Sequence, residues 1–154
     1  MARLESFEFA EQKRLKELPC PVFKSSPWVT GPPLQKRRVA IISTAGLHRR
    51  KDRPFTTEPG DVYRIIPGDV KAEDLVMSHV SVNFDRSGFE QDWNLVFPID
   101  RLNEMVQDGT VESVASYHYS FMGAVNPVNW EKEARKLAVL LRNDGVNAAF
   151  LIPV

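Results

Sequence analysis

Residues 38–46 read RVAIISTAG, a short apolar run that ends in four small residues. A continuous apolar run of this length is typical of a strand buried on both faces of a parallel sheet. The small residues after it let a backbone or a ligand approach closely. Because open α/β sheets bind ligands at the carboxyl ends of their strands, residues 43–46 form a candidate binding turn. An ordinary glycine-containing turn is an equally good interpretation.

Apolar runs on the C-terminal side of this segment predict the rest of the sheet. Residues 63–66 read as a strand and stop at a Pro-Gly-Asp turn, and residues 74–80 form another apolar run. Residues 111–117 suit a further strand, and residues 146–154 form a last strand of the buried type.

Two stretches carry apolar residues at helical spacing, and both end at a glycine. The first helix follows Pro98 and stops at Gly109, and the second covers about residues 130–143, with Asn126 or Asn129 as its cap. Their apolar positions are Leu102, Met105 and Val106 in the first, and Ala134, Leu137, Ala138 and Leu141 in the second. The order of elements predicts an α/β fold with a largely parallel sheet and flanking helices, a three-layer type. The polar residues 83–92 are expected to be a surface loop.

The chain divides into an N-terminal arm, residues 1–38, and a single α/β domain, residues 39–154. A polar helix is plausible over residues 4–18, and five prolines between residues 19 and 33 forbid regular structure after it. Phe23 and Trp28 are available to pin the arm to its own core or to a partner subunit, and a local anchor is the simpler interpretation.

Composition excludes several classes of function. Twenty basic and twenty acidic side chains cancel, which argues against a nucleic-acid or membrane surface. No apolar run reaches the length of a spanning helix, and the mixed N-terminus is unlike a signal peptide, so a cytoplasmic location is expected. With the single cysteine Cys20, no internal disulfide forms. The spacing of the three histidines supports no metal site.

Polar residues at the predicted strand ends are the candidate site. In a parallel sheet these ends converge, so we expect the substrate-binding residues there to be Ser43, Thr44, Gly46, His79, Tyr119 and Ser120. Either His118 or His48 suits a general acid, because imidazole transfers protons near neutral pH. Arg64 is a candidate for gripping a substrate carboxylate. For each histidine, an ordinary core or loop role is an equally good interpretation.

The motifs of the chain resemble those of the selenoprotein B family of glycine, sarcosine, betaine and D-proline reductases. Residues 118–123, HYSFMG, are the most specific piece. The resemblance runs from Arg38 to the last residue, with motifs in order and in spacing at residues 39–48, 60–69, 74–79, 92–102 and 144–154. It resembles most closely the short, D-proline reductase type of subunit.

The resemblance implies where the chemistry lies. In that family, selenocysteine or cysteine directly follows the strand that resembles residues 150–154, so the catalytic residue is expected immediately after Val154. Since UGA encodes selenocysteine, we expect this sequence to stop at such a codon, leaving the domain incomplete at its C-terminus. The 154 residues themselves contain no obvious nucleophile.

The resemblance also implies a reaction. A selenolate attacks the α-carbon of a small amino-acid-like substrate and helps to cleave its C–N bond, and a dithiol or thioredoxin-like protein supplies electrons. A partner subunit with a pyruvoyl group activates amine substrates, so the protein is expected to be oligomeric. The alternative functions are a naturally truncated, non-catalytic binding or scaffold subunit, and a stand-alone small-molecule binding domain.

Overall fold

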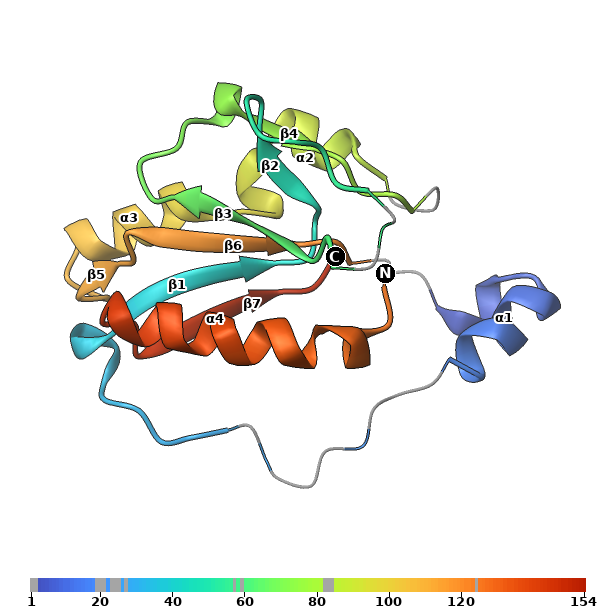
Figure 1. The fold of residues 1–154 in the computed structure, drawn as a ribbon, viewed down its shortest axis with the longest axis horizontal. Helices are drawn as coiled ribbons and strands as arrows, with labels where there is room; N and C mark the ends of the chain where they lie inside the picture. Colours follow the sequence, from blue (N-terminus) through green and yellow to red (C-terminus); the bar gives the residue numbers. More distant parts are fainter. Residues whose placement is uncertain are drawn as a thin grey trace.

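The computed structural model describes residues 3–18, 22, 26, 28–56, 58, 60–81, 85–123 and 125–154 (Figure 1). The predicted α/β class is confirmed. The strands are β1 (Arg38–Ser43), β2 (Leu47–Arg49), β3 (Tyr63–Pro67), β4 (Leu75–Met77), β5 (Ser113–Val114), β6 (Tyr117–Phe121) and β7 (Ala148–Ile152). The helices are α1 (Phe9–Lys16), α2 (Ser87–Gln91), α3 (Ile99–Gln107) and α4 (Glu131–Asn143).

Strand β1 is the centre of a curled sheet. It pairs in parallel with β7 along one edge, and with β5 and then β6 along the other. Strand β3 pairs antiparallel with β6, so β3 and β7 are the outer strands (Figure 1). The sheet is therefore mixed: the pairings of β1 are parallel, as in a largely parallel sheet, and the pairing of β3 with β6 departs from that arrangement. A short apolar run does not reveal the direction of its neighbour, which depends on how the intervening chain crosses the sheet.

Each face of the sheet has its own apolar cluster. On one face, Leu137 of α4 packs with Tyr119 and Phe121 of β6. On the other face, α3 and the segment before it pack against β1 and β3, and the antiparallel pair β2–β4 adds Leu47 and Leu75. Helices therefore lie on both faces, but the three-layer arrangement is not confirmed, since a second small sheet covers part of one face.

The two helices predicted from apolar spacing are confirmed as α3 and α4. Gly109 and Gly145 follow them with φ of 77° and 70°, the left-handed backbone that ends helices. Asn126 caps the 3-10 turn Pro127–Trp130 that leads into α4, its side chain accepting from the Val128 backbone N–H at 3.1 Å.

Two elements were not predicted. Strand β2 begins directly after Gly46, in a stretch to which the sequence analysis assigned no element, and α2 lies within the expected surface loop 83–92. The expected strand 111–117 begins later and is broken, because β5 has two residues and β6 starts at Tyr117.

Among the arm residues that the structure describes, none belongs to either apolar cluster. Helix α1 has no buried residue, and it stands away from the sheet (Figure 1). The expectations for Cys20 and Phe23, and for the prolines at 19, 21 and 27, concern residues outside the described part of the chain. Across the described residues, every helix is too short or too polar to cross a bilayer.

Candidate active site

Three parallel strands end together, and Thr44 joins them. Its backbone N–H donates to the Ile152 carbonyl of β7 at 3.0 Å, and its carbonyl accepts from the Gly123 N–H at 2.9 Å. Its hydroxyl oxygen accepts from the Val154 N–H at 2.8 Å. The carboxyl ends of β1, β6 and β7 are therefore held at one residue, at the edge of the sheet where ligands of this fold class bind.

Two glycines allow this close approach. Gly46 has a φ of 66°, and a β-carbon on it would lie 3.1 Å from the His79 backbone. A β-carbon on Gly123 would lie 2.7 Å from the Thr44 carbonyl oxygen and 3.0 Å from His79 Nε2. Gly46 was predicted as a site residue. Gly123 was not, although it ends the most specific motif of the sequence.

His79 borders the same place from the loop after β4. It is buried, its Nδ1 accepts from the Ser81 backbone N–H at 3.2 Å, and its carbonyl accepts from the Arg86 guanidinium. Burial, and then the Arg86 charge, lower the pKa of His79. The ring is therefore neutral near pH 7, and because Nδ1 is an acceptor, the proton is on Nε2, which faces Gly123.

Ser43 and Ser120, both predicted as site residues, stabilise the backbone of the turn from beneath its surface. The Ser43 hydroxyl accepts from the Ala45 N–H at 3.2 Å, and the Ser120 hydroxyl accepts from the Leu47 N–H at 2.7 Å. Both side chains are fully buried. They hold the backbone of the turn in its path, and they do not reach its surface.

His48 uses both ring nitrogens within the structure. Its Nδ1 lies 2.8 Å from the Arg49 carbonyl, so Nδ1 carries the proton, and its Nε2 lies 2.8 Å from the Ser78 hydroxyl. The ring therefore ties β2 to the residue that precedes His79.

His118, Tyr119 and Ser120 lie inside β6, whereas the sequence placed them after a strand. The His118 side chain supplies an acceptor to β1 where β5 has ended and β6 begins. Its Nδ1 accepts the Ile41 N–H of β1 at 2.9 Å, in place of a backbone carbonyl. The ring is fully buried, edge-on to Phe97, and burial lowers its pKa to about 4. In this structure His118 is a neutral part of the core.

Tyr119 points to the opposite face of the sheet from His118, because side chains alternate along a strand. It is buried against the Tyr63 ring, with centroids 5.9 Å apart, and burial raises its pKa. The structure therefore separates Tyr119 from the turn at Thr44.

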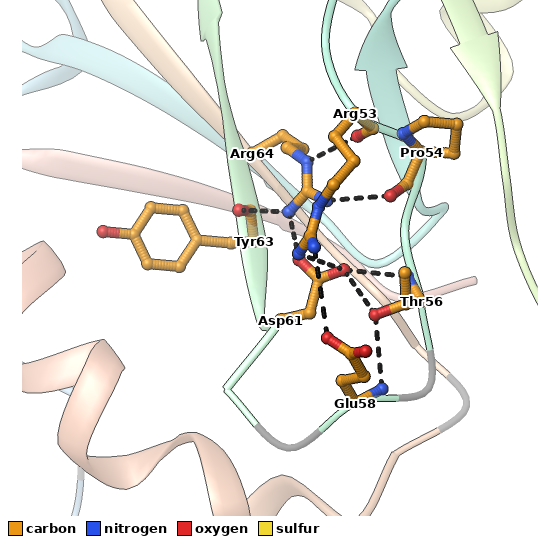
Figure 2. Close-up of polar contacts among 7 residues, drawn as sticks. All are labelled: Arg53, Pro54, Thr56, Glu58, Asp61, Tyr63 and Arg64. Carbon is orange, nitrogen blue, oxygen red and sulfur yellow. Dashed lines mark hydrogen bonds and ion pairs between the residues drawn. The ribbon is translucent and has the colours of Figure 1, made fainter.

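Arg64 lies in a separate polar network that holds the loop before β3 (Figure 2). Its guanidinium donates to Asp61 at 2.5 Å and to the backbone carbonyls of Arg53, Pro54 and Tyr63. It also stacks over the Phe55 ring at 4.2 Å. With its donors used in this way, Arg64 acts here as a loop anchor, away from the group at Thr44.

We expect Asp61→Asn to destabilise the protein by about 2 kcal/mol at neutral pH. The Arg64 guanidinium, followed by the Thr56 hydrogen bonds, lowers the pKa of Asp61 from 3.8 to about 2. A lowered carboxyl pKa stabilises the fold above about pH 4, and this contribution disappears as the pH falls towards 2. Urea unfolding of both proteins from pH 7 to pH 2 measures it. The matched control is Asp69→Asn at an exposed carboxylate, and equal stability of Asp61→Asn and the natural protein at pH 7 would contradict the anchor.

The structure thus brings together Thr44, Gly46, His79 and Gly123 at the end of β7. It places His118, Tyr119 and Arg64 elsewhere. Within the described residues, no group of three acidic, histidine or cysteine side chains is arranged to hold a metal ion. Fold and geometry together define an α/β protein with a candidate small-molecule site where its parallel strands end.

Comparison with known proteins identifies the family. The profile of glycine/sarcosine/betaine reductase selenoprotein B (GRDB) matches residues 8–153. The chain therefore belongs to this selenoprotein B family, which confirms the resemblance of its motifs. No solved structure matches the chain.

Curated relatives are named as reductase subunits. The D-proline reductase subunit gamma of Acetoanaerobium sticklandii is 29% identical over 120 residues, which are 77% of this chain and 49% of that protein. The sarcosine reductase complex component B subunit beta of Peptoclostridium acidaminophilum is 30% identical over 88% of this chain and 32% of its own length. The betaine reductase complex component B subunit beta of the same organism is 25% identical over 77% and 28%. The chain spans half or less of each relative.

Proposed function

We propose that this chain forms the substrate-facing part of a reductase subunit that cleaves a C–N bond, or a related carbon–heteroatom bond, in a small amino-acid-like compound. D-Proline, sarcosine, betaine and glycine are the candidate substrates, on the basis of the family and its named members. The observation that carries the proposal is the joint at Thr44, which holds the end of β7 beside His79 and Gly123.

The proposed reaction needs two electrons. The C–N bond breaks, a C–H bond forms, and the nitrogen leaves with its electron pair and takes up a proton. A dithiol supplies the electrons and becomes a disulfide. In this proposal the selenolate or thiolate of the residue immediately after Val154 displaces the nitrogen and forms a bond to the α-carbon. One thiol of the donor then attacks that selenium or sulfur while the carbon takes up a proton, and the second thiol releases the selenol or thiol as the donor becomes a disulfide. Strand β7 presents this reactive residue on a rigid element, next to the Thr44 joint.

The described residues around the joint suit binding and orientation. His79 is neutral and buried beside Gly123, with its Nε2 3.0 Å from where a β-carbon on that glycine would lie, so it fixes the Gly123 turn next to the joint. The glycines at 46 and 123 let the neighbouring backbone and His79 pack closely at the joint. As the resemblance to the family implies, the proposal assigns any pyruvoyl group to a partner subunit.

The coding DNA after the Val154 codon, together with the mass of the native protein, tests the position of the reactive residue. A UGA followed by an open frame, and a native mass that includes selenocysteine, are expected. Purified native complex should then reduce at least one of the four candidate substrates with dithiothreitol as donor. A different stop codon, or a native complex inactive on all four, would overturn the proposal and favour a binding subunit.

We expect Thr44→Val to lower kcat about tenfold in the full-length enzyme while changing the unfolding free energy by about 1 kcal/mol or less. The substitution removes the hydroxyl that binds the Val154 N–H, but the backbone bonds to Ile152 and Gly123 remain. Steady-state kinetics and urea unfolding measure the two effects. Thr110→Val is the matched control, since Thr110 is equally half-buried but follows α3. Unchanged kcat in Thr44→Val would exclude a role for the joint in positioning the reactive residue.

A further inference from the structure

The four candidate substrates share a carboxylate, so a site that selects them needs a cation. A guanidinium suits this role, because its planar N–H groups bind both carboxylate oxygens. Arg64, the residue predicted for it, is engaged with Asp61 and with three backbone carbonyls. Arg49 at the end of β2 is paired with Asp52 at 2.9 Å. The cation of the site therefore has to come from another part of the fold.

Arg86, which directly precedes α2, is bonded to the candidate site. Its guanidinium Nη2 donates to the backbone carbonyl of His79, and its positive charge contributes to the lowered pKa of the His79 imidazole. The His79 backbone in turn packs on Gly46, with its Cα 3.1 Å from the β-carbon position of that glycine. Among the described residues, no other basic side chain is bonded to Thr44, Gly46, His79 or Gly123.

Most of the Arg86 guanidinium remains available for a ligand. An arginine side chain carries five N–H donors, and within the described part of the chain Arg86 uses them for the single bond to His79. It forms no ion pair with any carboxylate of the described residues. The carboxylate next to it, Asp85, accepts instead from the Ser87 backbone N–H at 2.9 Å. Arg86 is also exposed, so its charge is accessible at the rim of the site.

The spacing around His79 suits one small amino acid. Standard bond lengths place the bonded Arg86 nitrogen within about 5 Å of the His79 Cα. The His79 Nε2 lies 3.0 Å from the β-carbon position of Gly123, which is itself 3.1 Å from the Thr44 Cβ. An α-amino acid that is held by a guanidinium and attacked at its α-carbon separates the two groups by roughly 8 Å. One intervening residue, His79, provides a separation of this order between Arg86 and the joint.

We propose that Arg86 binds the substrate carboxylate beside the end of β7, and so makes the site specific for carboxylates. The inference rests on the proposed function and deepens it. The bond to His79 uses one N–H of Nη2, and the second N–H of Nη2 together with those of Nη1 leaves two parallel donors for a carboxylate. The same bond orients the guanidinium before the substrate arrives.

Steady-state kinetics of the full-length native complex test this role with a substrate acid and its amide. Arg86→Gln should raise KM for the acid at least about tenfold with little change in kcat, and lower the preference for acid over amide by a similar factor. Arg86→Lys keeps the charge without the paired donors, so its KM should lie between the two. A loss that is equal for the acid and the amide would overturn the proposal, because it would mean that Arg86 only holds the loop at His79.

Arg50→Gln is the matched control. Arg50 is also exposed, and its guanidinium also donates to one backbone carbonyl, that of Glu73, at 2.6 Å. It follows β2 and is not bonded to the joint. Its substitution should therefore leave KM and the preference for acid over amide unchanged, and a tenfold rise in KM in this variant would contradict a specific role for Arg86.

Chemical modification separates the failure of this proposal from the failure of the proposed function. Phenylglyoxal reacts with accessible guanidinium groups, and peptide mass spectrometry follows Arg86 and Arg50 individually in the natural complex. A candidate substrate should slow the modification of Arg86 in a saturable manner, its amide should not, and Arg50 should react equally throughout. Protection in a complex that reduces none of the four compounds would support carboxylate binding while overturning the reductase. Reduction without protection of Arg86 would overturn its role and leave the reductase in place.

Discussion

Gly123→Ala should destabilise the protein by about 1–3 kcal/mol and lower kcat/KM at least about tenfold. The added β-carbon would lie 2.7 Å from the Thr44 carbonyl oxygen, which is backbone and accepts the Gly123 N–H itself. The Thr44 carbonyl and the Gly123 backbone cannot move apart to make room for the β-carbon without breaking that hydrogen bond. It would also lie 3.0 Å from His79 Nε2, so the neighbouring imidazole is displaced as well. Urea unfolding and steady-state kinetics of the full-length enzyme measure both effects.

Gly31→Ala is the control for this substitution. Its β-carbon would meet only the end of the Arg37 side chain, at 3.1 Å, and such a side chain moves aside at little cost. Stability and activity of Gly31→Ala should therefore stay close to those of the natural protein. If Gly123→Ala behaved in the same way, the packing of three strand ends at Thr44 would not be needed for the site.

His118→Leu should cost about 1–3 kcal/mol of stability, although it places an apolar side chain in an apolar core. The reason is the Ile41 N–H, which donates to His118 Nδ1 at 2.9 Å and would be left buried without an acceptor. His118→Asn offers an amide oxygen near the position of Nδ1 and should retain more stability than His118→Leu. Urea unfolding at pH 7 compares the three proteins, and a His118→Leu protein as stable as the natural one would contradict the role of the hydrogen bond.

The same histidine should make the fold sensitive to acid. Burial lowers the pKa of His118 to about 4 from its ordinary value of 6.5. Between pH 6.5 and pH 4, this histidine is therefore protonated in the unfolded chain and neutral in the folded chain. Stability is complete above about pH 6.5 and falls by up to about 3 kcal/mol as the pH approaches 4. The difference between the natural protein and His118→Asn over this range isolates the contribution, and a constant difference would contradict it.

The local elements of this protein were predictable from residue patterns. The apolar run at residues 39–42 is β1, the run at residues 63–66 is β3, and the spacing of apolar residues located α3 and α4. Each of these signals depends on neighbours within one or two turns of chain, and such short-range preferences survive in the folded state. The family could also be recognised from the sequence, because its motifs keep their order along the chain.

The candidate site was only partly predictable. The sequence indicated Thr44, Gly46 and His79 because small and polar residues after buried strands mark the carboxyl edge of a sheet, and the structure brings these three together. His118 was misplaced because β6 begins at Tyr117, after a break that residue preference does not reveal. The role of Gly123 depends on its distance from the Thr44 carbonyl, and no spacing along the chain encodes that distance.

The sequence by itself therefore determined the α/β class, the principal strands and helices, and membership of the reductase family. Tertiary structure alone decided that β3 runs antiparallel to β6, that Arg64 is engaged with Asp61, and that β7 exposes an apolar groove beside α4. The physical reason is that strand pairing and side-chain partners are contacts between residues far apart in sequence. Their outcome depends on the packing of the whole chain, whereas strand and helix propensity depends on local sequence.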